Sequence, residues 1–280
     1  MESQDTEMQV ERLGAVATQL AASREAVPKA LFHVELASVA SNAYMKLVAD
    51  TVFGLVDSIG ACTTACACLC WHRLMLVLAA GLNEQELFDL YQGVGGPVTC
   101  DDCADGADEA AGAVSRNDVA SHSPKASAVS SAIRLIMARH PTLSRVHFHA
   151  LGFHVLAERR GAGARRWGSA RAAAAAASIA ATLSACDATE PELHGNDLDM
   201  KSTVRLAVED PVTGAPATEV VLSAESPVGE WVWPVDADNV DGDAVKFVFA
   251  PVLVCKEPKH TVGLGDTISA TGLAVHVTKV

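Results

Sequence analysis

Hydrophobic residues recur along this chain with two periods, which predict helices alternating with strands. Apolar side chains fall at helical spacing over residues 8–20 and again over residues 44–59, so we predict two amphipathic helices there. Between them, residues 30–36 alternate as a strand does. A helix over residues 132–139 and a strand over residues 145–149 continue the order. This alternation is typical of an α/β domain.

The second half of the chain is richer in strand patterns. An alanine-rich helix is predicted over residues 172–185, and a short helix after the glycines near residue 263. Between these helices, four runs bounded by Gly, Pro and Asp predict strands over residues 204–208, 219–222, 231–234 and 245–254. We therefore predict one α/β domain over residues 1–280, a partial doubly wound sheet flanked by helices with an antiparallel, strand-rich section.

Two stretches interrupt this pattern. Residues 61–81 hold four of the eight cysteines, whose C-x₃-C-x-C-x-C spacing differs from the paired C-x₂-C of structural zinc sites. A soft-metal site, ordinary buried thiols and a retained intron are the three interpretations. Residues 93–131 are rich in Gly, Ala, Ser and Asp and are predicted to form a mobile surface loop. Within this loop, the acidic neighbours of Cys100 and Cys103 favour bystander thiols over a redox pair.

Charge and the first residues narrow the class of partner. A formal net charge of −13 argues against nucleic acids and anionic membranes, which are bound through positive surfaces. Residues 1–7 are polar and acidic without the apolar segment of a signal peptide behind them. The apolar run over residues 59–82 contains His72 and Arg73, which makes it a poor membrane span. We expect a cytoplasmic monomer that acts on small molecules.

The glycine turn near the C-terminus is the strongest candidate site. Gly263 and Gly265 let the backbone approach an anion without a Cβ in the way. The helix that follows would bring its N–H groups and the positive end of its dipole to the same point. Asp266 then stands in the first turn, where a base for phosphoryl transfer would stand. The alternative is an Asp N-cap of an ordinary helix.

Three further residues could bind a metal or serve a local structural role. Glu35 follows a predicted strand, at the end where ligands bind in open α/β sheets, and could hold Mg²⁺ or cap the next turn. Asn83 and Glu86 form N-x-x-E at a predicted helix start, which is also the spacing of a capping box. Spacing alone favours the structural role for all three.

Histidine and arginine clusters have ordinary explanations as well. His147 and His149 share one face of a predicted strand, with His154 nearby, but such histidines are more often satisfied core groups than metal ligands. A basic run could contact phosphate, although such runs usually lie in solvated loops. This run includes Arg159, Arg160, Arg165 and Arg166.

Three short motifs occur here in the order in which one enzyme family has them. They are His33-Val34-Glu35, Asn83-Glu84-Gln85-Glu86 and the glycine turn ending at Asp266. Together with Thr-Val-Gly-Leu-Gly-Asp-x-Ile-Ser-Ala around that turn, they make the chain resemble the ADP-dependent glucokinase and ADP-dependent phosphofructokinase family of ribokinase-like fold. The resemblance covers nearly the whole chain outside residues 61–81 and the loop after Gly93. In the family, Leu-Asn-x-x-Glu follows the preceding helix almost at once, so residues 61–81 are interpreted as an insertion.

The resemblance implies a reaction and a set of roles. Mg-ADP would donate its β-phosphoryl group to glucose, giving glucose 6-phosphate and AMP in glycolysis, with fructose 6-phosphate as the alternative acceptor. Asp266 would be the catalytic base, and Glu35, Glu86 and Asn83 would hold the metal. The family's nucleotide-binding residues correspond to Thr261, Val262, Gly263, Leu264 and Gly265.

The resemblance begins partway through the family. The N-terminal part of the family's large domain and its small lid domain, which carry most sugar contacts, have no counterpart before Met1. One alternative is therefore a non-catalytic, truncated family member that acts as a binding or regulatory module. Another is a ribokinase-like ATP-dependent sugar kinase, a group that shares the G-x-G-D turn but not normally the other two motifs.

Overall fold

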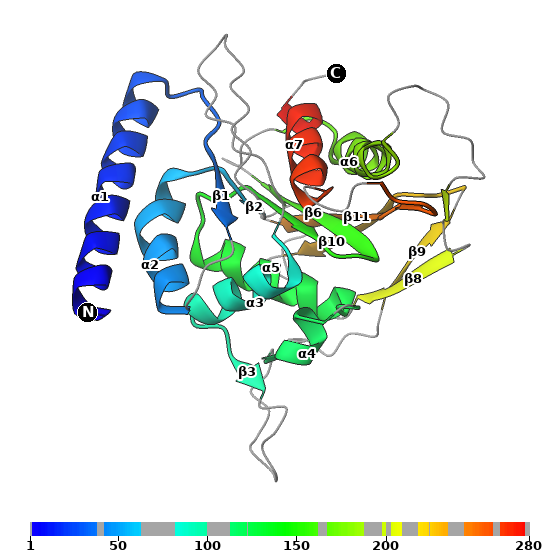
Figure 1. Cartoon of the computed structure of the whole chain (residues 1–280), viewed down its shortest axis with the longest axis horizontal. Helices are drawn as coiled ribbons and strands as arrows, with labels where there is room; N and C mark the ends of the chain where they lie inside the picture. Colours follow the sequence, from blue (N-terminus) through cyan, green and yellow to red (C-terminus); the bar gives the residue numbers. More distant parts are fainter. Residues whose placement is uncertain are drawn as a thin grey trace.

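Helices and strands alternate along the chain as the sequence pattern predicts (Figure 1). No helix in the described part of the chain is both long and apolar enough to cross a bilayer. The computed structural model describes residues 2–37, 42–62, 82–99, 113–121, 123–161, 167–187, 198–199, 203–208, 218–223, 225–234, 244–259 and 264–277.

The first elements match the prediction except where a helix gives way to a strand. They are α1 (Glu2–Ala26), β1 (His33–Ala37), α2 (Asn42–Val52), the 3₁₀ helix η1 (Phe53–Leu55) and β2 (Ser58–Cys62). The helix predicted through residue 59 was wrong at its end, because α2 stops at Val52 and residues 58–62 form a strand. Val56 and Ile59 are fully buried. Their hydrophobicity therefore fits either structure, and Gly54 in η1 interrupts the helix.

The region predicted as a long loop contains regular structure. Its neighbourhood holds α3 (Glu84–Gly93), β3 (Val98–Thr99), β4 (Val114–Ser115), α4 (Arg116–Val119) and α5 (Ala126–Arg139). The loop over residues 93–131 is therefore narrower than predicted, and residues 100–112, with Cys100 and Cys103, lie outside the described part. Ala126, Ser130 and Ser131 of α5 are buried. Such small residues carry little hydrophobic periodicity, yet they let α5 pack closely.

The second half confirms the predicted helices and strands within a few residues, but β6, β7 and β12 were not predicted as separate strands. It contains β5 (Arg145–His149), β6 (Phe153–Arg160), α6 (Ala170–Ala185), β7 (Leu198–Asp199), β8 (Thr203–Val208), β9 (Thr218–Ser223), β10 (Gly229–Pro234), β11 (Ala244–Pro251), β12 (Val254–Cys255) and α7 (Leu264–Val277). Arg159 and Arg160 of the basic run end β6. The guanidinium of Arg159 donates to the carbonyls of Leu143 and Met137. These bonds account for the position of Arg159 without a contact to phosphate. Arg165 and Arg166 lie outside the described residues, as do residues 63–81.

A six-stranded mixed sheet organises these elements in the order β1-β2-β5-β6-β11-β10. The first three strands are parallel and the last three run antiparallel to their neighbours, which confirms a partial doubly wound sheet with an antiparallel section. Helices α6 and α7 cover one face, while α3 and α5 lie on the other (Figure 1). The two faces differ in the size of the side chains between the layers.

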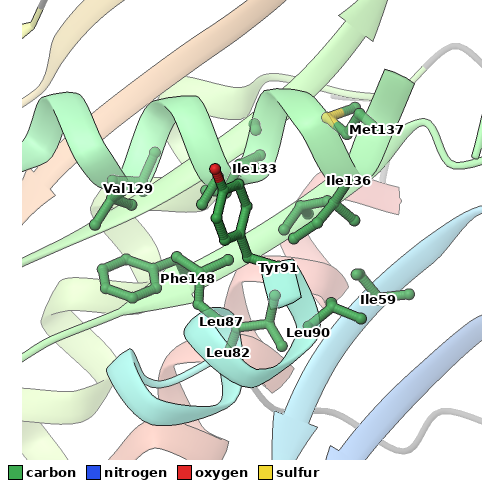
Figure 2. Packing of buried hydrophobic residues seen from close by; sticks show 14 of the residues in the cluster. Ile59, Leu82, Leu87, Leu90, Tyr91, Val129, Ile133, Ile136, Met137 and Phe148 are labelled. Atoms are coloured by element: carbon green, nitrogen blue, oxygen red, sulfur yellow. The ribbon is translucent and has the colours of Figure 1, made fainter. Parts of the chain in front are cut away.

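Large apolar side chains fill the layer beneath α3 and α5 (Figure 2). Phe148 of β5 is fully buried, and full burial of such a side chain stabilises the fold by about 1.5–3 kcal/mol. Its neighbours in this layer are Ile59, Leu82, Leu87, Leu90, Tyr91, Val129, Ile133, Ile136 and Met137.

Small residues form the opposite layer. Helix α6 buries mostly alanines, including Ala173, Ala174, Ala177 and Ala181. Ala177 and Ala181 pack with Ile268 of α7 in a small cluster. Helices of such small residues can approach the sheet closely, and the polar side chains of β5 and β6 lie at this close approach.

Candidate active site

The start of α7 lies against the carboxyl end of β5. Leu264 and Gly265 open the helix, and a Cβ added to Gly265 would lie 2.5 Å from Nε2 of His149. Only glycine therefore fits there without displacement of the imidazole. Because the first N–H groups of a helix have no partner within it, this end of α7 has the local geometry of an anion site.

Asn83 and Glu86 lie at the same edge of the sheet. The N–H of Leu82 donates to the carbonyl of His147 (2.7 Å), and the N–H of His149 donates to the carbonyl of Leu82 (2.8 Å). Leu82 thus pairs with β5 as a parallel bridge, and α3 begins just beyond it. This bridge places the first residues of α3 beside the carboxyl end of β5, where His149 also meets the start of α7.

The N-x-x-E motif forms a capping box. Oδ1 of Asn83 accepts from the N–H of Glu86 (2.9 Å), and Oε2 of Glu86 accepts from the N–H of Asn83 (3.0 Å). Glu86 is only 2% exposed, so its carboxylate is fixed by the helix start. Asn83 and Glu86 therefore have the structural role of a capping box in α3. Their role in metal binding stays a prediction.

Glu35 and Asp266 are placed by their backbones alone. Glu35 is in β1 opposite Gly60 of β2, and β1 lies two strands from β5, about 10 Å across the sheet. Because these strands are parallel, their carboxyl ends share an edge. The side chains of Glu35 and Asp266 lie outside the described part of the structure, as do Thr261, Val262 and Gly263.

The oxygen donors at this edge suit a hard cation. Carboxylate and amide oxygens such as those of Glu86 and Asn83 are ligands that Mg²⁺ accepts, directly or through its bound waters. The capping box engages the single side-chain oxygen of Asn83 and one carboxylate oxygen of Glu86. Among the described side chains, no group of three or more His, Cys, Asp or Glu could enclose a metal by itself.

A directed chain of buried hydrogen bonds runs beneath α6 and α7. Ser178 donates its hydroxyl hydrogen to the carbonyl of Pro251 (2.7 Å), so it must accept from Nε2 of His154 (2.8 Å). His154 then accepts at Nδ1 from Nε2 of His147 (3.1 Å). His147 in turn accepts at Nδ1 from Nη2 of Arg145 (3.4 Å). The chain accounts for His147 and His154 without a metal.

Burial keeps these imidazoles neutral. Desolvation, helped by nearby positive charge on other side chains, lowers the pKa of His154 to about 3 and places that of His147 well below its usual value. Desolvation and the Arg145 guanidinium likewise lower the pKa of His33 and of His276 to about 3. Burial also lowers the pKa of Arg145 to about 9, so this side chain remains charged at neutral pH.

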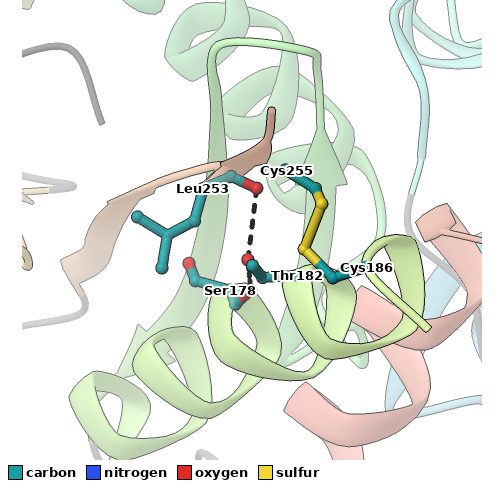
Figure 3. The surroundings of a disulfide bond; sticks show 5 residues. All are labelled: Ser178, Thr182, Cys186, Leu253 and Cys255. Atoms are coloured by element: carbon teal, nitrogen blue, oxygen red, sulfur yellow. Dashed lines mark hydrogen bonds between the residues drawn. A yellow bond between two sulfur atoms is a disulfide. The ribbon is translucent and has the colours of Figure 1, made fainter. Parts of the chain in front are cut away.

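A disulfide fastens the segment that leads to α7 (Figure 3). Cys186 at the end of α6 bonds Cys255 of β12, with Cα atoms 5.6 Å apart and a separation of 69 positions in sequence. Thr182 donates to the carbonyl of Leu253 (3.1 Å), and the N–H of Lys259 donates to the carbonyl of Ala185 (2.8 Å). Sequence reasoning missed this bond because neither cysteine stands in a recognisable spacing.

The parallel strands β1, β2 and β5, the antiparallel strands β6, β11 and β10, and the helix α7 at the end of the chain form an α/β fold of the ribokinase-like type. The sequence model of the ADP-specific phosphofructokinase/glucokinase conserved region matches residues 67–275. The chain belongs to the ADP-specific phosphofructokinase/glucokinase family. The match begins inside the stretch interpreted as an insertion.

Individual relatives agree with this assignment. The chain is 34% identical over 281 residues to the ADP-dependent glucokinase of Bos taurus, covering 98% of this chain and 45% of that protein. It is 27% identical to a protein named probable ADP-dependent glucokinase in Caenorhabditis elegans, covering 98% and 46%. The solved structure of the last common ancestor of ADP-dependent phosphofructokinases from Methanosarcinales superposes with a TM-score of 0.52 at 18% identity, covering 96% of this chain and 47% of that one. The chain thus spans less than half the length of these relatives.

Proposed function

We propose that this chain forms the nucleotide side of an ADP-dependent sugar kinase. The reaction would transfer the β-phosphoryl group of ADP to glucose and give glucose 6-phosphate and AMP. Glucose is preferred as the acceptor because the Bos taurus and Caenorhabditis elegans relatives carry glucokinase names, the first at 34% identity. Fructose 6-phosphate is the alternative acceptor, since family members act on either sugar by name.

Positioning and charge stabilisation would supply most of the rate. Backbone N–H groups of residues 263–266, at the positive end of α7, would hold the developing phosphate charge. Asp266 would accept the proton of the attacking sugar hydroxyl. Thr261 and Val262 would approach the nucleotide from the preceding segment.

Glu35, Glu86 and Asn83 would hold a Mg²⁺ ion at the same edge. When bound, this ion would neutralise phosphate charge during the transfer. The chain's own contribution is the fixed carboxylate of Glu86, which the capping box with Asn83 holds in one orientation.

One observation carries the proposal. The glycine at the start of α7 has no room for a side chain against His149, and that point lies beside the first residues of α3. An ordinary helix N-terminus has no need of so close an approach. A helix end that must meet a phosphate closely does, and the carboxyl edge of a parallel sheet is where such ligands bind.

A coupled assay tests the proposal with purified full chain and Mg²⁺. Glucose 6-phosphate formation is measured with ADP or ATP as the donor. In a second assay, fructose 6-phosphate replaces glucose and its phosphorylation is measured. We expect transfer from ADP only and a loss of at least 100-fold in kcat for Asp266→Asn, the lower range for removal of a general base. Unchanged kcat in this variant would contradict the role of Asp266.

Direct binding separates the remaining outcomes. ADP binding by calorimetry without sugar phosphorylation would identify a binding module instead of an enzyme. Transfer from ATP alone would identify an ATP-dependent sugar kinase. Absence of both ADP binding and transfer would overturn the proposed function of this chain.

Compartment and oligomeric state remain predictions. The cytoplasmic location expected from the sequence has one observation against it, the Cys186–Cys255 disulfide, because disulfides persist mainly in oxidising compartments. Thiol counting on protein isolated from its natural source would decide whether this bond forms there. Light scattering on the purified chain would test the expected monomer.

A further inference from the structure

Alternate residues of β5 contact α7 along much of its length. Arg145, His147 and His149 share one face of the strand, because side chains alternate across a sheet. Arg145 reaches the last turn of α7, His147 reaches its middle, and His149 reaches its first turn. One strand face therefore follows the helix from end to end.

The contact at the last turn is a buried hydrogen bond. Nε of Arg145 donates to Nδ1 of His276 (3.2 Å), and both side chains are fully buried. Trp167 stacks on the His276 ring with centroids 5.3 Å apart, and the N–H of Gly168 donates to the His276 carbonyl (2.6 Å). These bonds fix the end of α7 that lies farthest from the glycine turn.

The contacts at the middle and at the start place histidines against glycines. A Cβ on Gly272 would lie 2.9 Å from Cε1 of His147, and one on Gly265 would lie 2.5 Å from Nε2 of His149. Glycine is less favourable in a helix than alanine. Glycine stands at both positions where α7 contacts a histidine of β5. This indicates that close approach of α7 to β5 is kept at the expense of helix stability.

The strand face itself is held in one arrangement. The guanidinium of Arg145 donates from Nη1 to Ser58 Oγ (3.1 Å) and from Nη2 to His147, besides its bond to His276. Burial of this charge makes a poor source of stability, because desolvation opposes it. Its three directed bonds instead fix the rotamers of the groups on which α7 rests.

We infer that Arg145, His147 and His149 are positioning residues for phosphoryl transfer. They set the place of α7 along β5, and this sets the point at which the N–H groups of Gly265 and Asp266 meet the phosphate. The inference rests on the proposed function for its catalytic consequence. The placement of the helix can be tested without that function.

Gly272→Ala tests the inference, because Gly272 lies away from the proposed phosphate contacts. The added methyl group meets His147 and should displace α7, although alanine has the higher helix propensity. With the full chain, we expect about tenfold weaker ADP binding by calorimetry. Amides 264–270 should also exchange faster with deuterium, as measured by mass spectrometry without any ligand.

His147→Asn in the Gly272→Ala background is the matched rescue. Asn is shorter than His but can still accept from Arg145, so the double variant should regain most of the ADP affinity and amide protection. Ala274→Gly is the control, because Ala274 is exposed. It should lower the melting temperature and leave the dissociation constant for ADP unchanged.

Each outcome decides the inference. Wild-type exchange in Gly272→Ala, no rescue by His147→Asn, or an equal loss of affinity in Ala274→Gly would overturn it. If wild-type chain fails to bind ADP, the proposed function fails. The exchange data still decide whether β5 places α7.

Discussion

One face of the central sheet rests on large apolar side chains, and the other on a hydrogen-bonded line of polar groups under α7 and the alanine-rich α6. Strand β5 takes part in both: Val146 and Phe148 belong to the apolar core, while Arg145 and His147 belong to the polar chain. The apolar layer can supply most of the free energy of folding. The polar layer gains little from desolvated groups, but its directed bonds allow only one arrangement.

Phe148→Ala should lower the free energy of unfolding by about 4 kcal/mol, because it leaves a cavity in the apolar layer. We expect the dissociation constant for ADP to stay within twofold where the variant is folded. Urea unfolding and calorimetry measure the two effects, and Leu151→Ala, at a 70% exposed position in the same hairpin, is the control. Loss of ADP affinity with little loss of stability would reverse the roles assigned to the two faces.

Replacement of both Cys186 and Cys255 by serine should lower the free energy of unfolding by about 3 kcal/mol, since the bond closes a long loop in the unfolded chain. The loss should match the effect of a reducing agent on the wild-type chain. The double variant should be indifferent to that agent. Equal stability of reduced and oxidised wild-type protein would show that the disulfide between α6 and β12 does not stabilise the fold.

Acid should destabilise the polar layer. The pKa of His154 is about 3 in the folded chain and near 6.5 when unfolded, so between these values the unfolded state binds more protons. Stability should therefore fall as pH falls below about 6.5, by up to about 1.4 kcal/mol per pH unit for each such histidine. His154→Gln can keep both hydrogen bonds and cannot titrate. Unfolding at several pH values should give it a shallower slope than wild type, and an identical slope would contradict burial of a neutral His154.

Asn83→Ala should have the smallest effect on stability, about 1 kcal/mol, through loss of the cap of α3. Glu86→Gln retains an acceptor for the N–H of Asn83 and should cost less than this. If Glu86 also serves the metal, Glu86→Gln should require a higher Mg²⁺ concentration for half-maximal activity. An unchanged Mg²⁺ requirement would leave Glu86 with the structural role alone.

Sequence periodicity predicted the elements whose large side chains repeat, and alanine content predicted α6, but the small residues that open α5 were missed. The strands β8 to β11 stand within a few residues of their predicted bounds, because β-branched and aromatic runs end at Gly, Pro and Asp. The start of α5 was assigned to a loop, since Ala126, Ser130 and Ser131 carry no hydrophobic signal although they are buried. The start of β2 was assigned to a helix, because the buried Val56 and Ile59 fit both periods.

The sequence predicted the motifs of the candidate site. It did not predict the contacts that hold these motifs in place. Family-like motifs indicated Gly265 and the Asn83–Glu86 pair, and the structure brings these to one edge. Nothing in the local sequence indicated that His149 would fill the space beside Gly265, or that Cys186 would bond Cys255. Both contacts join residues far apart in the chain, and only the packing of α6 and α7 on the sheet creates them.

The central claim is that the start of α7 binds a nucleotide phosphate and needs its glycine to do so. Calorimetric titration of ADP into Gly265→Ala tests it most directly, with Gly54→Ala as control because a Cβ at Gly54 meets nothing within 4 Å. We expect Gly265→Ala to bind ADP at least tenfold more weakly, a loss of about 1.4 kcal/mol, and Gly54→Ala to bind as wild type does. Wild-type affinity in Gly265→Ala would contradict the account.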